Sequence, residues 1–209
     1  VPYKVENFEP VFGWSRIGFQ YCVKADSPMR TFADFVAETK KRRVTVGSIG
    51  RGSALHLHMV VMRRELGLNF DIVHFDGSSP AYAAVLGGHV DSAIGGAGSG
   101  SRQGSKLHFL TVTGPGRDRA LPNVPTLAEQ GFKVSAVEQL FFAETSPKVP
   151  ADRVKALSIA FEKAFAEPEL KQRFEAAGEF ITKSTPDELR AVHKQQSALV
   201  AAFKEELQK

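Results

Sequence analysis

Patterns typical of strands alternate with patterns typical of helices along the first two thirds of the chain. Apolar, β-rich runs occur at residues 17–23, 44–48, 70–75, 92–94 and 107–113. Between these runs, apolar residues recur at helical spacing and are bounded by glycine, serine and proline. This order is the signature of βαβ units. It therefore predicts an α/β fold, with a mostly parallel sheet covered by helices on both faces.

Two of the intervening helices have start and stop signals that can be checked against a structure. Ser79 is the expected N-cap of a helix that places proline in its first turn and ends at Gly87. Thr126 and Glu129 have the spacing of a capping box, which predicts a short helix ending near Gly131.

The last third of the chain differs, because after about residue 138 a single apolar stretch, 140–143, is followed by helix patterns only. The best-marked helix has Thr185 as its N-cap and Glu188 completing a capping box. Its expected buried stripe is Leu189, Val192, Leu199, Val200 and Phe203. Helices with apolar stripes need a sheet to cover, and this part supplies at most one or two strands. We therefore expect it to be half of a lobe.

Composition excludes several classes of protein. A single cysteine, Cys22, excludes an internal disulfide framework and multi-cysteine zinc or iron–sulfur sites. There is no run of about 18 apolar residues, and residues 1–4 lack the features of a signal peptide, so any export signal is expected to be absent or already removed. The net charge of +4 is scattered, and the basic cluster 40–43 is expected to complement a helix dipole rather than bind nucleic acid.

The glycine-rich turn between residues 46 and 56 is the most informative local stretch. A strand passes through three glycines into a helix that begins at Ser53, so free amides are available to an anion such as a carboxylate or phosphate. Charge-assisted hydrogen bonds from Ser48, Ser53 or the backbone, each worth roughly 1.5–3 kcal/mol, would outweigh the helix dipole, at about 0.3–1 kcal/mol. The turn lacks the residues of a Walker loop or a dinucleotide fingerprint. A tight turn whose glycines only serve packing is the alternative.

Two further loops are expected at the same edge of the sheet. Residues 76–80 join the end of a strand to the start of a helix and offer hydroxyls and amides. Residues 95–100 are rich in glycine and either leave room for a ligand or form a mobile linker. Ligands of open α/β sheets bind outside the carboxyl ends of the strands, so these loops predict a polar cleft there.

Catalysis is not predicted. Ser53, His56 and Asp76 include the residue types of a nucleophilic triad, but serine and histidine three residues apart on one helical turn are poorly placed for proton transfer. His56 and His58 do not share a helix face, so they make a poor metal pair. The histidines are expected to be structural, except that contact of His56 with a ligand is an even alternative. No cofactor or metal is expected.

Several spaced motifs resemble those of one family. Residues 47–57 are similar to the GSxGxGSxxHL segment of the periplasmic solute receptors of tripartite tricarboxylate transporters, often called Bug receptors. Residues 73–81 are similar to the loop V-P-Y-K-G-G-x-P-A, residues 87–91 to G-G-Q-V-D, and residues 121–131 to L-P-D-V-P-T-x-x-E-x-G. The resemblance covers nearly the whole chain and keeps the order of the motifs.

The resemblance implies a type II periplasmic binding protein, in which two α/β lobes close on a small organic acid and present it to a membrane permease. Residues 14–136 would form the complete second lobe. Residues 1–13 and 137–209 would belong to the first lobe, whose N-terminal part is expected to be missing. The implied protein is a periplasmic, non-enzymatic receptor for a di-, tri- or aromatic carboxylate, with no nucleic-acid partner. The implied ligand-binding residues are Ser48, Gly52, Ser53, His56, Gly77, Ser78 and Ser79.

Two departures from the family pattern leave the ligand's charge open. Residues 74–78 read His-Phe-Asp-Gly-Ser where the family has Pro-Tyr-Lys-Gly-Gly, so Asp76 stands near the expected cleft in place of a cation. The loop 95–100 is also more glycine-rich than usual. A ligand-sensing or regulatory domain of the same fold, and a serine hydrolase using Ser53, are the alternative functions.

Overall fold

The computed structural model describes residues 7–208, and a five-stranded sheet forms its larger part. Its strands lie in the order β4 (Phe70–Phe75), β3 (Val44–Ile49), β5 (Ser92–Gly96), β2 (Phe19–Lys24) and β6 (Leu107–Val112). β3 pairs in parallel with β4 and β5, whereas β2 pairs antiparallel with β5 and β6. The predicted mostly parallel sheet is confirmed, and β2 is its one antiparallel strand.

Helices cover both faces of this sheet, as predicted. Alternate residues of β2 point to opposite faces, so Tyr21 joins the core under α1 (Phe32–Lys41) and α2 (Ala54–Glu65), while Cys22 joins the core under α3 (Ser78–Leu86). The short helix α4 (Ala97–Ser101) and the turn η2 (Gly104–Lys106) connect β5 to β6.

Helix α2 is buried on all sides rather than along one stripe. Its residues from Leu55 to Met62 are all buried, because the C-terminal helices α7 (Pro186–Ala202) and α8 (Lys204–Gln208) cover the side that faces away from the sheet. Phe203, between these two helices, belongs to the same core, and Arg64 of α2 lies over its ring. The C-terminus of the chain therefore completes the core of the larger part.

A second, two-stranded sheet extends from the first. It pairs β1 (Glu9–Ile17) antiparallel with β7 (Gln139–Thr145). The single strand predicted at 17–23 is wrong in its start, since Gly18 separates β1 from β2. Pro10, Gly13 and Arg16 obscure the alternation of β1 in the sequence. The other edge of β1 bonds to the segment that precedes α7, through paired backbone hydrogen bonds between Gly13 and Ser184.

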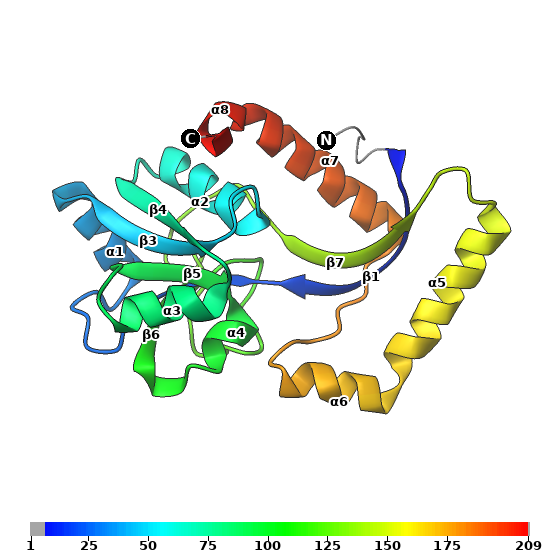
Figure 1. Cartoon of the computed structure of the whole chain (residues 1–209), viewed down its shortest axis with the longest axis horizontal. Coiled ribbons are helices and arrows are strands. Elements are labelled where there is room, and N and C mark those ends of the chain that lie inside the picture. Colours follow the sequence, from blue (N-terminus) through cyan, green and yellow to red (C-terminus); the bar gives the residue numbers. More distant parts are fainter. Residues whose placement is uncertain (1–6, 209) are drawn as a thin grey trace.

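Helices α5 (Ala151–Ala166) and α6 (Pro168–Ala176) project away from the five-stranded sheet, as the yellow and orange arm in Figure 1 shows. Phe161 and Phe165 of α5 stack on Trp14 of β1, yet no residue of either helix is buried. Leu157 and Ile159 are each 43% exposed. These side chains are therefore not covered by any other element of the described chain.

The C-terminal helix starts as predicted, but its buried stripe is narrower. The capping box of Thr185 and Glu188 is formed in both directions. Leu189 and Val192 are buried against the β1 sheet, whereas Val200 is 45% exposed. Val200 was expected in the stripe, but it follows Leu199 by one residue and so lies about 100° around the helix axis from it.

Two other helix predictions are wrong in part. The Thr126–Glu129 capping box is formed, but the residues up to Gly131 make turns rather than a helix, because Gly131 at φ 83° reverses the chain too soon. Helix α3 has Gly77 as its N-cap instead of Ser79. Gly77 has φ 150°, a conformation that side chains disfavour, so the turn occurs there and Ser79 already lies inside the helix.

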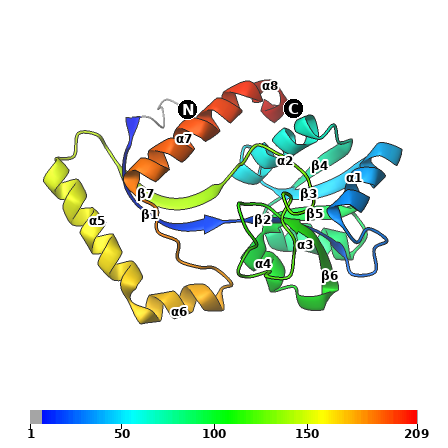
Figure 2. The ribbon, with the colours of Figure 1, turned by 180° about the vertical axis from the view of Figure 1, so that it is seen from behind.

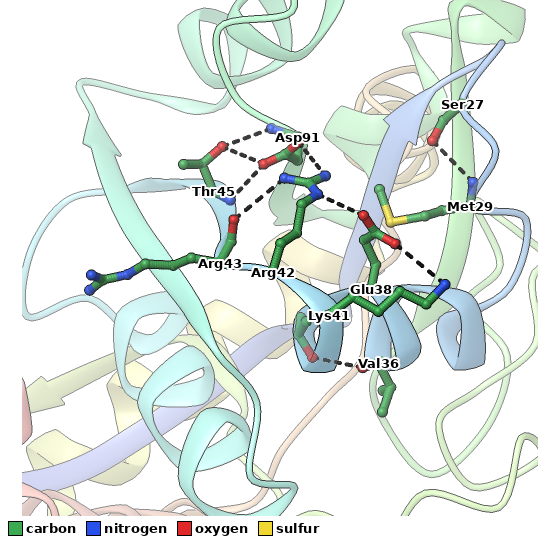
Figure 3. A network of polar contacts seen from close by, with 10 residues as sticks. Ser27, Met29, Val36, Glu38, Lys41, Arg42, Arg43, Thr45 and Asp91 are labelled. Carbon is green, nitrogen blue, oxygen red and sulfur yellow. Dashed lines mark hydrogen bonds and ion pairs between the residues drawn. The ribbon is translucent and has the colours of Figure 1, made fainter.

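Asp91 connects β3 and α1 at the end of the sheet opposite the carboxyl ends of the parallel strands (Figure 3). One carboxylate oxygen accepts hydrogen bonds from the N–H and hydroxyl of Thr45, both at 2.8 Å, and the other pairs with Arg42 at 2.8 Å. Arg42 also bonds Glu38 of α1. Partial burial raises the pKa of Asp91, but Arg42 and Thr45 outweigh it and hold this pKa below its ordinary value.

We expect Asp91→Ala to lower the free energy of unfolding by about 2 kcal/mol, because it removes the acceptor of the Thr45 N–H and hydroxyl and leaves Arg42 with Glu38 alone. Arg43→Gln is the matched control, since it removes the more exposed Arg43–Asp71 pair at the same end, worth at most about 1 kcal/mol. Urea denaturation measures both variants. Equal losses would contradict the structural role of Asp91.

Candidate functional site

A cavity of about 530 Å³ lies at the carboxyl ends of the parallel strands. Segments that follow β4, β5 and β6 supply Ser78 at the start of α3, Ser99 in α4 and Thr113 to one side of it. The β1–β7 part and the segment after α6 supply the rest, including Arg16 and Phe180. Both ribbon views show this segment approaching α4 (Figures 1 and 2), and the backbones of Gly98 and Gly178 are in contact there.

A buried polar network supports the cavity from the side of α3. The Tyr82 hydroxyl accepts a hydrogen bond from the Gln20 amide at 2.9 Å and lies 2.9 Å from the Ser99 hydroxyl. Because Ser99 donates to the Gly96 carbonyl at 2.8 Å, Tyr82 is the donor in its contact with Ser99. Burial raises the pKa of Tyr82, so the phenol is neutral. The network holds the short helix α4 on the sheet.

The first motif forms one closely bonded loop. The Ser53 hydroxyl accepts a hydrogen bond from the His56 N–H at 3.2 Å and donates to the Ile49 carbonyl at 2.9 Å. The Gly52 N–H donates to Nδ1 of His56 at 3.0 Å, and Ser48 is buried in β3. The structure thus brings Ser48, Gly52, Ser53 and His56 together, but their hydrogen bonds are to one another and to the loop backbone. Ile49, between them, lines the cavity.

His56 is neutral in this loop. Burial first, and then the charges of His74, Arg51 and Arg63, lower its pKa from 6.5 to about 4. Its Nδ1 accepts a hydrogen bond, so its proton is on Nε2. The ring packs edge-to-face against His74 at 4.7 Å between centroids. Since Nδ1 is occupied and Ser53 donates to a carbonyl, this pair is not arranged as a base and a nucleophile.

The second motif contributes one cavity residue. Ser78 begins α3 and lines the cavity, whereas Gly77 shapes the turn and Ser79 is exposed on the helix. Of the seven predicted site residues, Ser78 alone is in the cavity wall. No local motif predicted Arg16, Thr113 or Arg119, which also line the cavity. Ser99 lies within the glycine-rich stretch 95–100, which was predicted to leave room for a ligand or to form a linker.

Half of the six charged side chains in the cavity wall form ion pairs within the described residues. Arg16 pairs with Glu138 at 2.8 Å, and Arg117 pairs with Glu129 at 3.0 Å. Desolvation raises the pKa of Asp118, although this carboxyl accepts a hydrogen bond from the Ala120 N–H at 2.8 Å. Hydroxyl groups, amides and charged groups of both signs suit a small polar ligand.

Within residues 7–208, no three histidine, cysteine or acidic side chains are grouped to hold a metal ion. Over the same range, no helix combines the length and apolar character required to cross a membrane.

Comparison with known proteins decides the family. The sequence model of one protein family, the tripartite tricarboxylate transporter family receptor (TctC), matches residues 1–202 of the chain. The chain belongs to this family. The resemblance drawn from the sequence motifs is therefore confirmed.

Curated relatives agree with this assignment. The chain is 32% identical over 183 residues to the UPF0065 protein in the gbd 5' region of Cupriavidus necator, covering 82% of this chain and 55% of that protein. It is 31% identical to a UPF0065 protein of Agrobacterium vitis, covering 83% of this chain and 51% of the relative. The TctC chain therefore spans about half the length of these relatives.

Solved structures have the same fold. A TctC solute-binding protein from Polaromonas matches with a TM-score of 0.84 at 24% identity, over 98% of this chain and 72% of that one. MatC from Rhodopseudomonas palustris, with bound malate, matches with a TM-score of 0.77 at 20% identity, over 95% and 70%. The predicted α/β class and periplasmic-binding-protein fold are confirmed.

Proposed function

We propose that this TctC chain is a periplasmic receptor that binds a small organic carboxylate in the 530 Å³ cavity and delivers it to the permease of a tripartite tricarboxylate transporter. The position of the cavity carries the proposal. It lies at the carboxyl ends of the strands, between the five-stranded part and the β1–β7 part, and its size is typical of small-molecule sites.

The start of α3 is the proposed carboxylate contact. Gly77 caps this helix without a side-chain hydrogen bond, so the first amides, those of Ser78 and Ser79, lack an intrahelical partner. Such amides and the helix dipole favour an anion. Ser78 adds a hydroxyl in the cavity wall, and Ser99 and Thr113 lie in the same wall.

Contact of the ligand with Ser48, Gly52, Ser53 and His56 stays a prediction. Their hydrogen bonds within the loop would have to be exchanged for bonds to the ligand. If these hydrogen bonds are kept, the role of the 47–56 loop is to position Ile49 in the wall of the cavity.

The division into lobes is part of the same proposal. Residues 14–136 would form one lobe, and residues 1–13 and 137–209 would contribute to the other, so that closure of the lobes excludes water from the ligand. Two R. palustris neighbours, MatC with malate and Rpa4515 with adipate, support the carboxylate class.

Isothermal titration calorimetry with malate and adipate tests the proposal. We expect saturable binding of at least one acid, and Ser78→Ala is expected to weaken it by about 2- to 12-fold through the loss of one hydrogen bond. Ser146→Ala, in an exposed turn away from the cavity, is the matched control and should bind like the unaltered chain. Absence of binding by any small di-, tri- or aromatic carboxylate would refute the function.

A further inference from the structure

We infer that Arg119 is the charge-selecting residue of the cavity and pairs directly with a carboxylate of the ligand. The inference rests on the proposed function and adds a residue that no family motif indicated. Three arginines line the cavity, namely Arg16, Arg117 and Arg119, and they differ in what already neutralises them.

Arg16 and Arg117 are occupied. Arg16 donates to Glu138 at 2.8 Å and to the Ser184 hydroxyl at 3.1 Å. Arg117 donates from Nε to both carboxylate oxygens of Glu129, each at 3.0 Å. To bind a ligand carboxylate, either arginine would have to share or break an existing ion pair, which would offset much of the gain.

Arg119 is different, because no carboxylate in residues 7–208 forms an ion pair with it. Its guanidinium lies over the ring of Phe180, 5.3 Å from the centroid. The ring is uncharged, and no hydrogen bond or ion pair within residues 7–208 engages the Arg119 N–H groups, so a ligand carboxylate can bond to them in a bidentate manner. The ring therefore restricts the cation without neutralising it.

The contact between Arg119 and Phe180 also connects the five-stranded part with the β1–β7 part at the cavity. Arg119 lies in the loop after β6, and Phe180 lies in the segment between α6 and α7. Both residues line the cavity wall. A ligand carboxylate bound at this edge would thus be held where the two parts meet.

The acidic residues of the wall do not all compete for Arg119. Glu138 is paired with Arg16, and Asp118 accepts the Ala120 N–H. Within the described range neither Glu179, beside Phe180, nor Asp118 forms an ion pair, so both carboxylates oppose an anion. The carboxylate is therefore expected on the Arg119 side, with Glu179 limiting its affinity.

Calorimetry with adipate and its neutral diamide, adipamide, tests the inference on the whole chain. The unaltered chain should prefer adipate. Arg119→Gln should weaken adipate binding by about tenfold or more and remove most of this preference, as loss of a charge-assisted hydrogen bond predicts. Arg119→Lys should bind adipate more weakly than the unaltered chain and more tightly than Arg119→Gln, because an ammonium keeps the charge but is not bidentate. Glu179→Gln should tighten adipate binding.

Arg43→Gln is the matched control, since Arg43 is exposed, lies outside the cavity and should leave the affinity unchanged. Circular dichroism of each variant shows whether it is folded. If the unaltered chain binds adipate and folded Arg119→Gln binds it equally well, the role of Arg119 is wrong and the receptor function stands. If the unaltered chain binds no carboxylate, both proposals fail together.

Discussion

Gly95→Ala is expected to lower the free energy of unfolding by about 3 kcal/mol, because the added methyl group meets a buried tyrosine. A Cβ atom at Gly95 would lie 2.1 Å from the hydroxyl oxygen of Tyr82 and 2.9 Å from its ring carbon Cζ. Tyr82 is fully buried and bonded to Gln20 and Ser99, so its ring cannot move without breaking that network. Overpacking and the loss of buried hydrogen bonds then add.

A double-mutant cycle with Tyr82→Phe distinguishes this cause from a general loss of strand stability. Removing the hydroxyl relieves the closest clash, so the double variant should lose less than the sum of the two single variants. Gly116→Ala is the control, because a Cβ there meets no atom within 4 Å. Urea denaturation gives the three losses. A Gly95→Ala loss no larger than that of Gly116→Ala would contradict the packing around Tyr82.

Acid is expected to destabilise the fold through His58, by about 3 kcal/mol between pH 6.5 and pH 4. His58 is 2% exposed and packs between the rings of Phe19 and Tyr21, and neither of its ring nitrogens has a hydrogen-bond partner in the described chain. Burial lowers its pKa from 6.5 to about 4. Below pH 6.5 the unfolded chain therefore binds a proton at His58, whereas the folded chain binds it only near pH 4. The free energy of unfolding thus falls as the pH falls from 6.5 to 4.

His58→Leu should flatten the dependence of unfolding free energy on pH in this window, relative to the unaltered chain. His89→Leu, at an exposed position, is the matched control for removing a histidine. Denaturation at a series of pH values between 4 and 7 provides the comparison. Identical slopes for His58→Leu and the unaltered chain would show that His58 is not protected from protonation.

The cavity lies at the edge of the sheet where the sequence predicts a polar cleft, but most of its wall residues are not among the predicted ones. A glycine turn before a helix exposes amides and so predicts Ser53 and His56 as ligand contacts, but in the structure their groups bond within that turn. Ser78 was predicted and lines the cavity. Arg119 and Phe180 could not be paired from the sequence, because they are 61 residues apart and belong to no shared motif.

The sequence by itself determined the features that depend on near neighbours. The order of strands and helices, the Ser53 and Thr185 caps and the spaced family motifs all follow from residues a few positions apart, whose hydrogen bonds and periodicity are local. Only the tertiary structure decided the rest. The antiparallel β2, the burial of α2 on all sides and the cavity wall depend on contacts between distant segments, and those contacts arise only when the segments pack together.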